Sequence, residues 1–229
     1  MSGAAWVLIV TGGFGVLGSA VVEAALGDGW QVAAVDGAPA RRGPAPEGVL
    51  DIGGVDLTDA AQADAAVARV ADAFGRVDAL ANVAGGFVWQ TVAEGDPAAF
   101  ERMHAMNVTT ALNACRSCLP HLLASGRGRI VNVGANGALK AAAGMGAYAA
   151  SKSGVHRLTE ALAEELKGKV GVNAVLPSIL DTAANRADMP DADPSKWVAP
   201  ADLAKVILFL AGEESRAVTG ALISVTGEV

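Results

Sequence analysis

Tyrosine, cysteine, histidine and basic charge are all scarce in this sequence. The 229 residues include one tyrosine, two cysteines and three histidines, and the formal net charge is −7 at pH 7. Nucleic acids and anionic membranes are bound by basic patches, so we expect neither partner. No apolar run approaches the roughly 20 residues that span a bilayer. The apolar start AAWVLIV lacks a basic flank, which favours a first strand over a signal peptide and predicts a cytoplasmic protein.

The two cysteines form a CxxC, but they lack the surroundings of a redox or metal site. A redox CxxC begins a helix, where the helix dipole lowers the pKa of a thiol; Cys115 and Cys118 lie inside the helical pattern NVTTALNACRSCLPHLL. The histidines, His104, His121 and His156, are scattered and lack ligand or triad spacing. We expect two small helix residues in a reducing compartment, no metal site, and no catalytic histidine.

Short apolar runs alternate with longer amphipathic ones along the whole chain. This alternation predicts βαβ units and a single α/β domain over residues 1–229, with a doubly wound parallel sheet of seven strands and helices on both faces. The strands are expected near residues 5–11, 30–35, 49–55, 77–83, 128–134, 170–176 and 221–226.

Two stretches interrupt this alternation. Residues 37–48, GAPARRGPAPEG, are rich in proline and glycine and indicate a surface loop in place of a helix. Residues 177–200 contain four prolines and read as irregular. The second stretch is long enough to include a substrate lid at about residues 183–200.

A glycine-rich turn follows the first predicted strand. In TGGFGVLG, Gly13, Gly15 and Gly18 have GxGxxG spacing and precede a helix. Glycines suit such a turn because the chain bends tightly, a pyrophosphate approaches the backbone, and the helix packs closely on the strand. The turn therefore predicts a Rossmann-type dinucleotide site. Its expected cofactor-binding residues are Gly12, Gly13, Phe14, Gly15, Val16, Leu17 and Gly18.

Asp36 ends the second predicted strand, WQVAAVD. A carboxylate there accepts hydrogen bonds from the adenosine ribose 2′-hydroxyl and repels a 2′-phosphate, which favours NAD over NADP. Two alternatives stay open. Arg41 or Arg42 could reach back to a phosphate if the loop folds over, and Asp36 could be an ordinary turn aspartate.

Tyr148 precedes Lys152 by one helical turn in the run AYAASK. A neighbouring ammonium favours phenolate and lowers a phenol pKa from its usual value of about 10. The pair is therefore a candidate acid/base couple. The alternative is a boundary tyrosine beside a solvated lysine.

Taken together, these motifs resemble the classical short-chain dehydrogenases/reductases in order and spacing, over essentially the whole chain. The resemblance implies an NAD(P)-dependent oxidoreductase with a small-molecule substrate. It also implies a homodimer or homotetramer, assembled through two long helices at roughly residues 97–124 and 146–167. Besides the turn and the Tyr148–Lys152 pair, the matching segments are Asp56-Leu57-Thr58, Asn82-Val83-Ala84-Gly85, Asn107 and Pro177 to Thr182.

The resemblance further implies cofactor contacts in three of these segments. It implies that the adenine edge is held by Asp56 and Leu57. It implies that a bend formed by Asn82, Ala84 and Gly85 lets the cofactor lie across the sheet. It also implies that the nicotinamide carboxamide is anchored by Pro177, Ile179 and Thr182.

The implied catalytic residues are Tyr148, Lys152 and Asn107. Tyr148 would exchange the proton that accompanies hydride transfer, and Lys152 would bind the nicotinamide ribose. Asn107 would kink its helix and bind a water that connects Lys152 to solvent. A helix asparagine bonded to a carbonyl is the alternative.

Two residues depart from the classical pattern. Ala135 occupies the place of a serine whose hydroxyl polarises the substrate carbonyl, and the loss of one such donor typically costs ~10² to 10³ in rate. Val16 stands where the middle glycine of TGxxxGxG is expected. In both respects the chain resembles the dihydropteridine reductase branch, as it does in the segment LDTAANRADMP and in Phe87, an aromatic ring expected near the nicotinamide. The expected substrate contacts are Ala135, Phe87, Trp89 and Trp197.

Three functions follow as hypotheses. The first is NADH-dependent reduction of a quinonoid dihydropterin, whose conjugated ring spreads charge and has less need of the serine. The second is a carbonyl/alcohol dehydrogenase in which Asn136 or a backbone donor compensates for Ala135. The third is a non-catalytic NAD-binding sensor, against which the retention of Tyr148 and Lys152 argues.

Overall fold

One parallel sheet forms the centre of the molecule. The computed structural model describes residues 5–229, and over that range the chain forms seven strands in the order β3-β2-β1-β4-β5-β6-β7. All seven predicted strands are confirmed, most of them a residue or two shorter than expected. Their bounds are β1 Val7–Thr11, β2 Gln31–Val35, β3 Val49–Ile52, β4 Ala79–Asn82, β5 Arg129–Val133, β6 Gly171–Pro177 and β7 Leu222–Val225.

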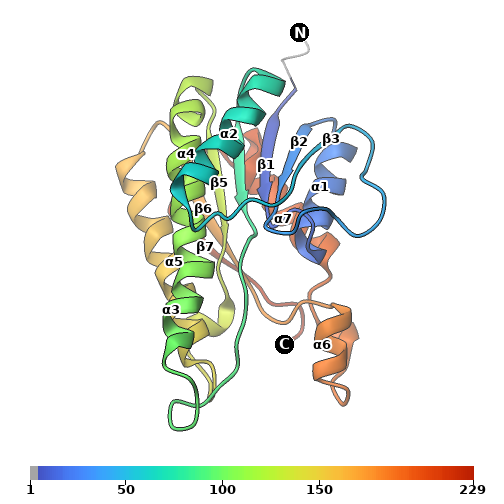
Figure 1. Ribbon diagram of the computed structural model, residues 1–229, viewed down its shortest axis with the longest axis vertical. Helices are drawn as coiled ribbons and strands as arrows, with labels where there is room; N and C mark the ends of the chain where they lie inside the picture. Colours follow the sequence, from blue (N-terminus) through green and yellow to red (C-terminus); the bar gives the residue numbers. More distant parts are fainter. Residues whose placement is uncertain (1–4) are drawn as a thin grey trace.

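Helices cover both faces of this sheet, as Figure 1 shows. One apolar layer packs α1 (Val16–Gly27) and α7 (Pro200–Ala211) against the strands. The opposite layer packs α2 (Ala60–Phe74), α4 (Thr110–Ser125) and α5 (Gly146–Glu165). Because both faces are buried, the strands are continuous apolar runs such as VLIVT in β1. The doubly wound Rossmann architecture predicted from the sequence is therefore confirmed.

The direction of winding reverses beside β1. The chain proceeds from β1 outward to β2 and β3, and then returns to place β4 on the other side of β1. In open parallel sheets, ligands bind outside the carboxyl ends of the strands at such a reversal. The fold thus places the candidate site between the ends of β1, β2 and β4.

The first long helix predicted, at residues 97–124, is present but irregular. It consists of α3 (Ala98–His104), a π-helical segment (Ala105–Thr109) and α4. The wider turn of a π-helix is often found at functional sites, and Asn107 lies in its middle. The second long helix, predicted at residues 146–167, is α5.

The two interrupting stretches differ from each other. Residues 37–48 have no helix or strand, as predicted. Residues 177–200 are more regular than expected, because they contain α6 (Ala183–Asp188) and a short 3₁₀ turn, Pro194–Lys196. Thr182 explains why α6 begins here, since its Oγ1 accepts a hydrogen bond from the Asn185 amide (3.1 Å) and caps the helix.

Both cysteines are buried among the core residues of α4. Burial raises the pKa of the Cys115 thiol to about 12 and that of Cys118 still further. Among residues 5–229, no three His, Cys, Asp or Glu side chains are grouped to hold a metal ion. Within the same range, no helix combines the length and apolar character needed to cross a bilayer.

Candidate active site

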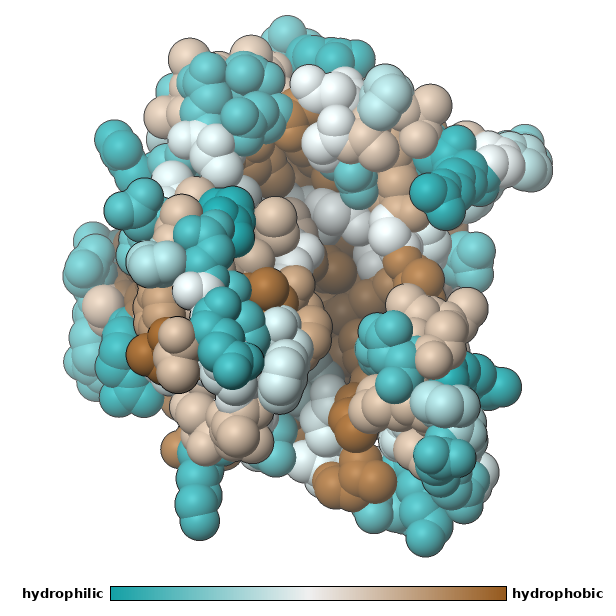
Figure 2. All heavy atoms as spheres, turned by 60° about the horizontal axis from the view of Figure 1, so that its bottom comes forward, coloured by the Kyte–Doolittle hydropathy of each residue, from teal (hydrophilic) through white to brown (hydrophobic). Residues whose placement is uncertain are grey.

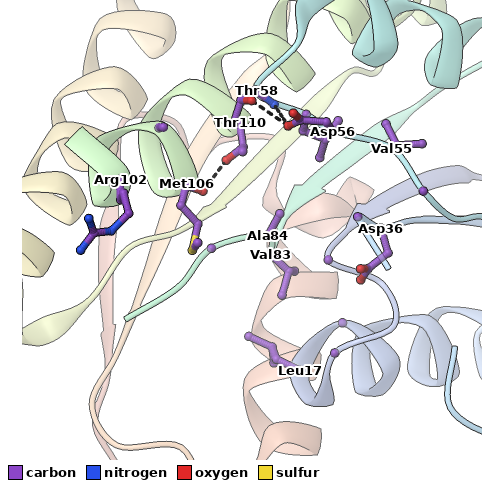
Figure 3. Close-up of a pocket in the computed structure, with 18 of the residues that line it drawn as sticks. Leu17, Asp36, Val55, Asp56, Thr58, Val83, Ala84, Arg102, Met106 and Thr110 are labelled. Carbon is purple, nitrogen blue, oxygen red and sulfur yellow. Dashed lines mark hydrogen bonds between the residues drawn. The ribbon is translucent and has the colours of Figure 1, made fainter. Parts of the chain in front are cut away.

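An open cavity of about 880 Å³ lies at the carboxyl ends of the strands. Figure 2 shows this side of the molecule deeply hollowed, with apolar residues on the floor and rim. In Figure 3, Leu17, Asp36, Asp56 and Met106 surround the hollow beside Ala84. The cavity brings together ten of the residues predicted to bind the cofactor: Gly12, Gly15, Val16, Leu17, Gly18, Asp36, Asp56, Leu57, Ala84 and Gly85.

Three glycines allow the turn after β1 to pack as tightly as predicted. Gly12 has a φ of +65°, and a Cβ there would lie 2.8 Å from the Ala84 nitrogen. A Cβ on Gly18 would collide with the Gly12 carbonyl oxygen, and one on Gly13 would lie 2.6 Å from the Ala34 Cβ. Gly13 therefore packs the turn on β2 and does not line the cavity. The backbone left bare between β1 and α1 fits the approach of a pyrophosphate.

Val16 replaces the expected middle glycine without filling this space. Its side chain is 59% exposed and lies at the edge of the cavity. The departure at this position is therefore compatible with a dinucleotide site.

Asp36 is fixed at the edge of the cavity. Its Oδ2 accepts from the Phe14 amide (3.0 Å) and its Oδ1 accepts from the Ala38 amide (2.9 Å). These bonds hold the carboxylate beside the glycine-rich turn, as a ribose-binding aspartate requires. Phe14 contributes through its backbone and is not among the residues that line the cavity.

Asp56 and Leu57 line the cavity beyond the end of β3. Asp56 Oδ1 accepts hydrogen bonds from the amide and hydroxyl of Thr58. Asn113, on the buried face of α4, donates to the carbonyl oxygens of Leu57 (2.9 Å) and Thr58 (3.1 Å). Asn113 was missed from the sequence. The available signal was an amide among the small apolar residues of TTALNAC.

Asn82 is not among the residues that line the cavity, although a direct contact with the cofactor is predicted for it. Its side chain is buried, and Nδ2 donates to Asn132 Oδ1 (2.9 Å), which joins the ends of β4 and β5. The bend itself is held by Thr11, a residue not singled out from the sequence. Thr11 Oγ1 accepts from the amides of Val83 (3.1 Å) and Ala84 (3.2 Å).

Asn107 holds Gly86, which follows Ala84 and Gly85 in the segment after β4. Its Oδ1 accepts from the Gly86 amide (2.9 Å), and its Nδ2 donates to the Gly86 carbonyl (3.1 Å) and to Ser151 Oγ (2.9 Å). Both amide protons are therefore used within the protein. The helix forms a π segment at Asn107, where a kink was expected, and the carbonyl that the Asn107 side chain contacts lies in another segment. A Cβ on Gly85 would lie 2.6 Å from Asn107 Oδ1 and 3.3 Å from Lys152 Nζ, so this glycine admits both side chains.

Tyr148 and Lys152 project from the first turns of α5. Lys152 is buried and its Nζ donates to the Val133 carbonyl (2.7 Å). Burial lowers the pKa of Lys152 to about 8, and burial raises the pKa of Tyr148 to about 12. The predicted lowering of the Tyr148 pKa is therefore wrong for the chain by itself, because loss of water around the phenol disfavours its charged form.

Ala135 is 3% exposed, and its amide is already engaged. That N–H donates to Nε2 of His156 (3.3 Å), which lies one turn beyond Lys152 on α5. His156, to which the sequence gave no role, thus anchors the turn after β5. The possible compensating residue Asn136 accepts a hydrogen bond from Ser224 (3.3 Å).

The segment after β4 contains two aromatic side chains, one of which contacts Tyr148 at the mouth of the site. The Phe87 ring meets the Tyr148 ring edge to face, with centroids 4.9 Å apart. Phe87 and Trp89 are both more than half exposed, and Trp89 Nε1 donates to the Ala143 carbonyl (3.1 Å). Trp197 is only 6% exposed, so its predicted contact with substrate is not supported.

The segment after β6 is ordered by backbone hydrogen bonds. The Ile179 carbonyl accepts from the Val198 amide (2.9 Å), Pro177 is buried at the end of β6, and Thr182 caps α6. These three residues are not among those that line the cavity.

Comparison with known proteins identifies the family of this chain. Residues 6–193 match the family model described as short chain dehydrogenase. The chain is 32% identical to 2-(S)-hydroxypropyl-CoM dehydrogenase 3 of Xanthobacter autotrophicus, covering 96% of this chain and 95% of that protein. It is 30% identical to acetoacetyl-CoA reductase of Allochromatium vinosum, covering 96% and 97%.

A solved structure agrees with these relatives. The crystal structure of 3-ketoacyl-(acyl-carrier-protein) reductase from Brucella melitensis, complexed with NADH, superimposes with a TM-score of 0.85 at 27% identity and covers 98% of both chains. With the glycine turn, the Tyr148–Lys152 pair and the reversal of the sheet in place, the chain belongs to the short-chain dehydrogenase/reductase family and is an oxidoreductase of that family.

Proposed function

We infer that this oxidoreductase prefers NADH and reduces a conjugated ring substrate of the quinonoid dihydropterin class. The observation that carries the inference is at Ala135. No hydroxyl stands at this position, and its backbone amide is bound to His156. A carbonyl substrate would therefore lack a donor that is usually worth ~10² to 10³ in rate. A conjugated ring spreads the developing charge over several atoms and depends less on that donor.

The aromatic rings at the mouth of the site support the same substrate class. Phe87 packs against Tyr148 and still exposes more than half of its surface. A planar ring beside Tyr148 would find an apolar face to contact. The proposed lid, residues 183–200, follows β6, and its closure would exclude water from the reacting atoms.

Asp36 supports the preference for NADH. Both of its oxygens are held at the edge of the cavity by backbone amides. The fixed negative charge suits a 2′-hydroxyl and opposes a 2′-phosphate.

The residues around Tyr148 account for the chemistry. A bound nicotinamide dinucleotide supplies the hydride. With a pKa of about 12, Tyr148 holds its proton near neutral pH and is set to donate it to the reduced ring. Lys152, with a pKa of about 8, is mostly protonated at pH 7 and binds the ribose beside the phenol. Asn107 fixes Gly86 and Ser151, and Ser151 directly precedes Lys152 and donates to the Tyr148 carbonyl.

A coupled assay tests the proposal. Purified protein with NADH is expected to reduce a chemically generated quinonoid dihydropterin above the spontaneous rate, and Tyr148→Phe to remove that activity without changing cofactor affinity. Ala135→Ser should leave pterin reduction nearly unchanged. Absence of turnover above background by the folded, NADH-binding protein would overturn the pterin proposal.

The second candidate is a carbonyl/alcohol dehydrogenase. Its support is the similarity to a hydroxypropyl-CoM dehydrogenase and an acetoacetyl-CoA reductase. Turnover of a ketone or alcohol panel by the wild-type protein would favour it over the pterin. If that panel gives nothing while Ala135→Ser creates activity, this candidate is excluded.

A further inference from the structure

Arg41 lies near the adenosine end of the cavity, but it is turned toward β3. It belongs to the loop at residues 37–48, where a basic side chain could reach a cofactor phosphate. In the structure its Nε donates to Asp51 Oδ2 (2.8 Å) and its Nη2 donates to Asp51 Oδ1 (2.7 Å). This two-point contact is the strongest geometry that a guanidinium makes with a carboxylate.

The rest of the guanidinium is also covered. Its plane lies over the Phe14 ring, with Arg41 Cζ 4.9 Å from the ring centroid. Its Nη1 reaches Ser19 Oγ (3.5 Å) on α1. As a result the Arg41 side chain is only 8% exposed, although it comes from a surface loop.

These contacts connect Arg41 to the ribose site through one residue. Phe14 stacks on Arg41 with its ring and donates its amide to Asp36 with its backbone. The guanidinium is therefore a neighbour of the carboxylate expected to bind the ribose, while its charge is neutralised on the side of β3. Arginine is the side chain best suited to bind a phosphate at this place.

We propose that Asp51 is a specificity-determining residue, which holds Arg41 against β3 so that the adenosine site accepts a ribose 2′-hydroxyl and rejects a 2′-phosphate. Asp51 acts through Arg41 and does not itself contact the cofactor, so it is a positioning residue. The inference rests on the proposed NADH preference, to which it adds a second determinant beside Asp36.

Dissociation constants for NADH and NADPH, and for ADP and 2′,5′-ADP, test this role without relying on turnover. Asp51→Ala frees the guanidinium, and a charge-assisted bond to the 2′-phosphate is expected to improve NADPH binding relative to NADH by about tenfold. The gain is partial because Asp36 remains. The same shift should appear with 2′,5′-ADP relative to ADP.

A double-mutant cycle separates Arg41 from a general charge effect. Arg41→Met added to Asp51→Ala should abolish the gain, whereas Arg41→Met alone should leave NADPH binding at its wild-type level. The charge-matched control is Asp72→Ala, at an exposed position near the end of α2 away from the cavity; it should change neither ratio. If Asp51→Ala disturbs the loop, as seen by circular dichroism, the isosteric Asp51→Asn removes the charge while keeping the volume.

The outcomes distinguish this inference from the proposed function. If the wild-type protein binds neither dinucleotide, the proposed function fails. If it binds NADH and no Asp51 variant changes the NADPH to NADH ratio, the role of Asp51 is refuted. If the double variant keeps the gain in NADPH binding, the role of Asp51 is also refuted. The same holds if Arg41→Met alone lowers the NADPH affinity of the wild-type protein.

Discussion

Burial of the Lys152 ammonium lowers the free energy of unfolding at neutral pH. Its pKa falls from 10.5 in the unfolded reference to about 8 through burial. Between these values the unfolded chain binds more protons than the folded one, so the free energy of unfolding rises with pH across that window. Below pH 8, holding the ammonium out of water costs on the order of 3 kcal/mol, by the rule of 1.36 kcal/mol per pKa unit.

Replacing this lysine should therefore stabilise the protein while removing activity. Lys152→Met relieves the charge penalty but loses the bond to the Val133 carbonyl, worth about 1 to 2 kcal/mol. We expect a net gain of about 1 to 2 kcal/mol at pH 7 by chemical denaturation, shrinking toward pH 10. The control is Lys167→Met, an exposed lysine paired with Glu164, which should change stability little. A variant less stable than wild type at pH 7 would contradict the burial argument.

Individual site residues were predictable where their role depends on neighbours in sequence. Gly12, Gly15, Gly18 and Asp36 follow from strand, turn and helix in immediate succession, and all four line the cavity. The burial of Asn82 and Trp197 could not be predicted, because it is decided by distant segments. Asn82 meets Asn132 across the sheet. The pKa of Tyr148 was misjudged for the same reason.

At the scale of elements, the π-helical segment positions the loop after β4. Asn107 lies at its centre and makes three hydrogen bonds to Gly86 and Ser151. The widened turn directs the amide toward the loop. The strands and both long helices could be predicted from periodicity. The π segment and α6 could not, because one depends on contacts with α5 and a distant loop and the other is too short to show a period.

Loss of the Asn107 side chain should loosen this loop. Asn107→Ala leaves the Gly86 amide and carbonyl without their partner, and we expect about 2 to 3 kcal/mol of destabilisation. Hydrogen exchange should rise at residues 84–90 more than in the strands. Asn113→Ala, which removes an amide from α4, is a matched control and should affect residues 57–58 instead. If the two variants raise hydrogen exchange equally at residues 84–90 and 57–58, Asn107 does not act locally on the loop after β4.

At the scale of the whole molecule, the end of the sheet away from the cavity is held by a charged cluster. Asp78 is fully buried and accepts from the Val7 amide, Arg76 and Arg127. Burial alone would raise the pKa of Asp78, but the hydrogen bonds from Arg127, Arg76 and Val7 lower it below its usual value. Its stabilising contribution is therefore present above about pH 4 and is lost as the pH falls through the folded-state pKa.

Neutralising Asp78 should destabilise the fold without touching the active site. Asp78→Asn leaves two arginines without their carboxylate, and we expect a loss of about 3 kcal/mol at pH 7 that shrinks below pH 4. Asp202→Asn removes one partner of an exposed pair on α7 and should cost less than 1 kcal/mol. Equal losses for the two variants at pH 7, or a loss for Asp78→Asn that does not shrink as the pH falls below 4, would contradict this role of the buried carboxylate.

The outer face of the two long helices suits assembly of the whole molecule. Phe100 is 44% exposed, and a groove of about 440 Å³ between α3 and α5 is lined by Phe100, Ala147 and Ala150. Small side chains let a second helix pair approach closely, so we expect a homodimer, or a homotetramer if α7 adds a second interface through the exposed Phe209.

Sedimentation of two charge variants distinguishes these assemblies. Ala150→Glu places a charge in the groove and should yield monomers, because an unpaired buried charge opposes the contact. Phe209→Asp should leave a dimer unchanged but should convert a tetramer to a dimer. Both variants are expected to keep their far-ultraviolet circular dichroism, since the substituted side chains are exposed. A wild-type protein that sediments as a monomer at micromolar concentration would show that this helix face serves another purpose.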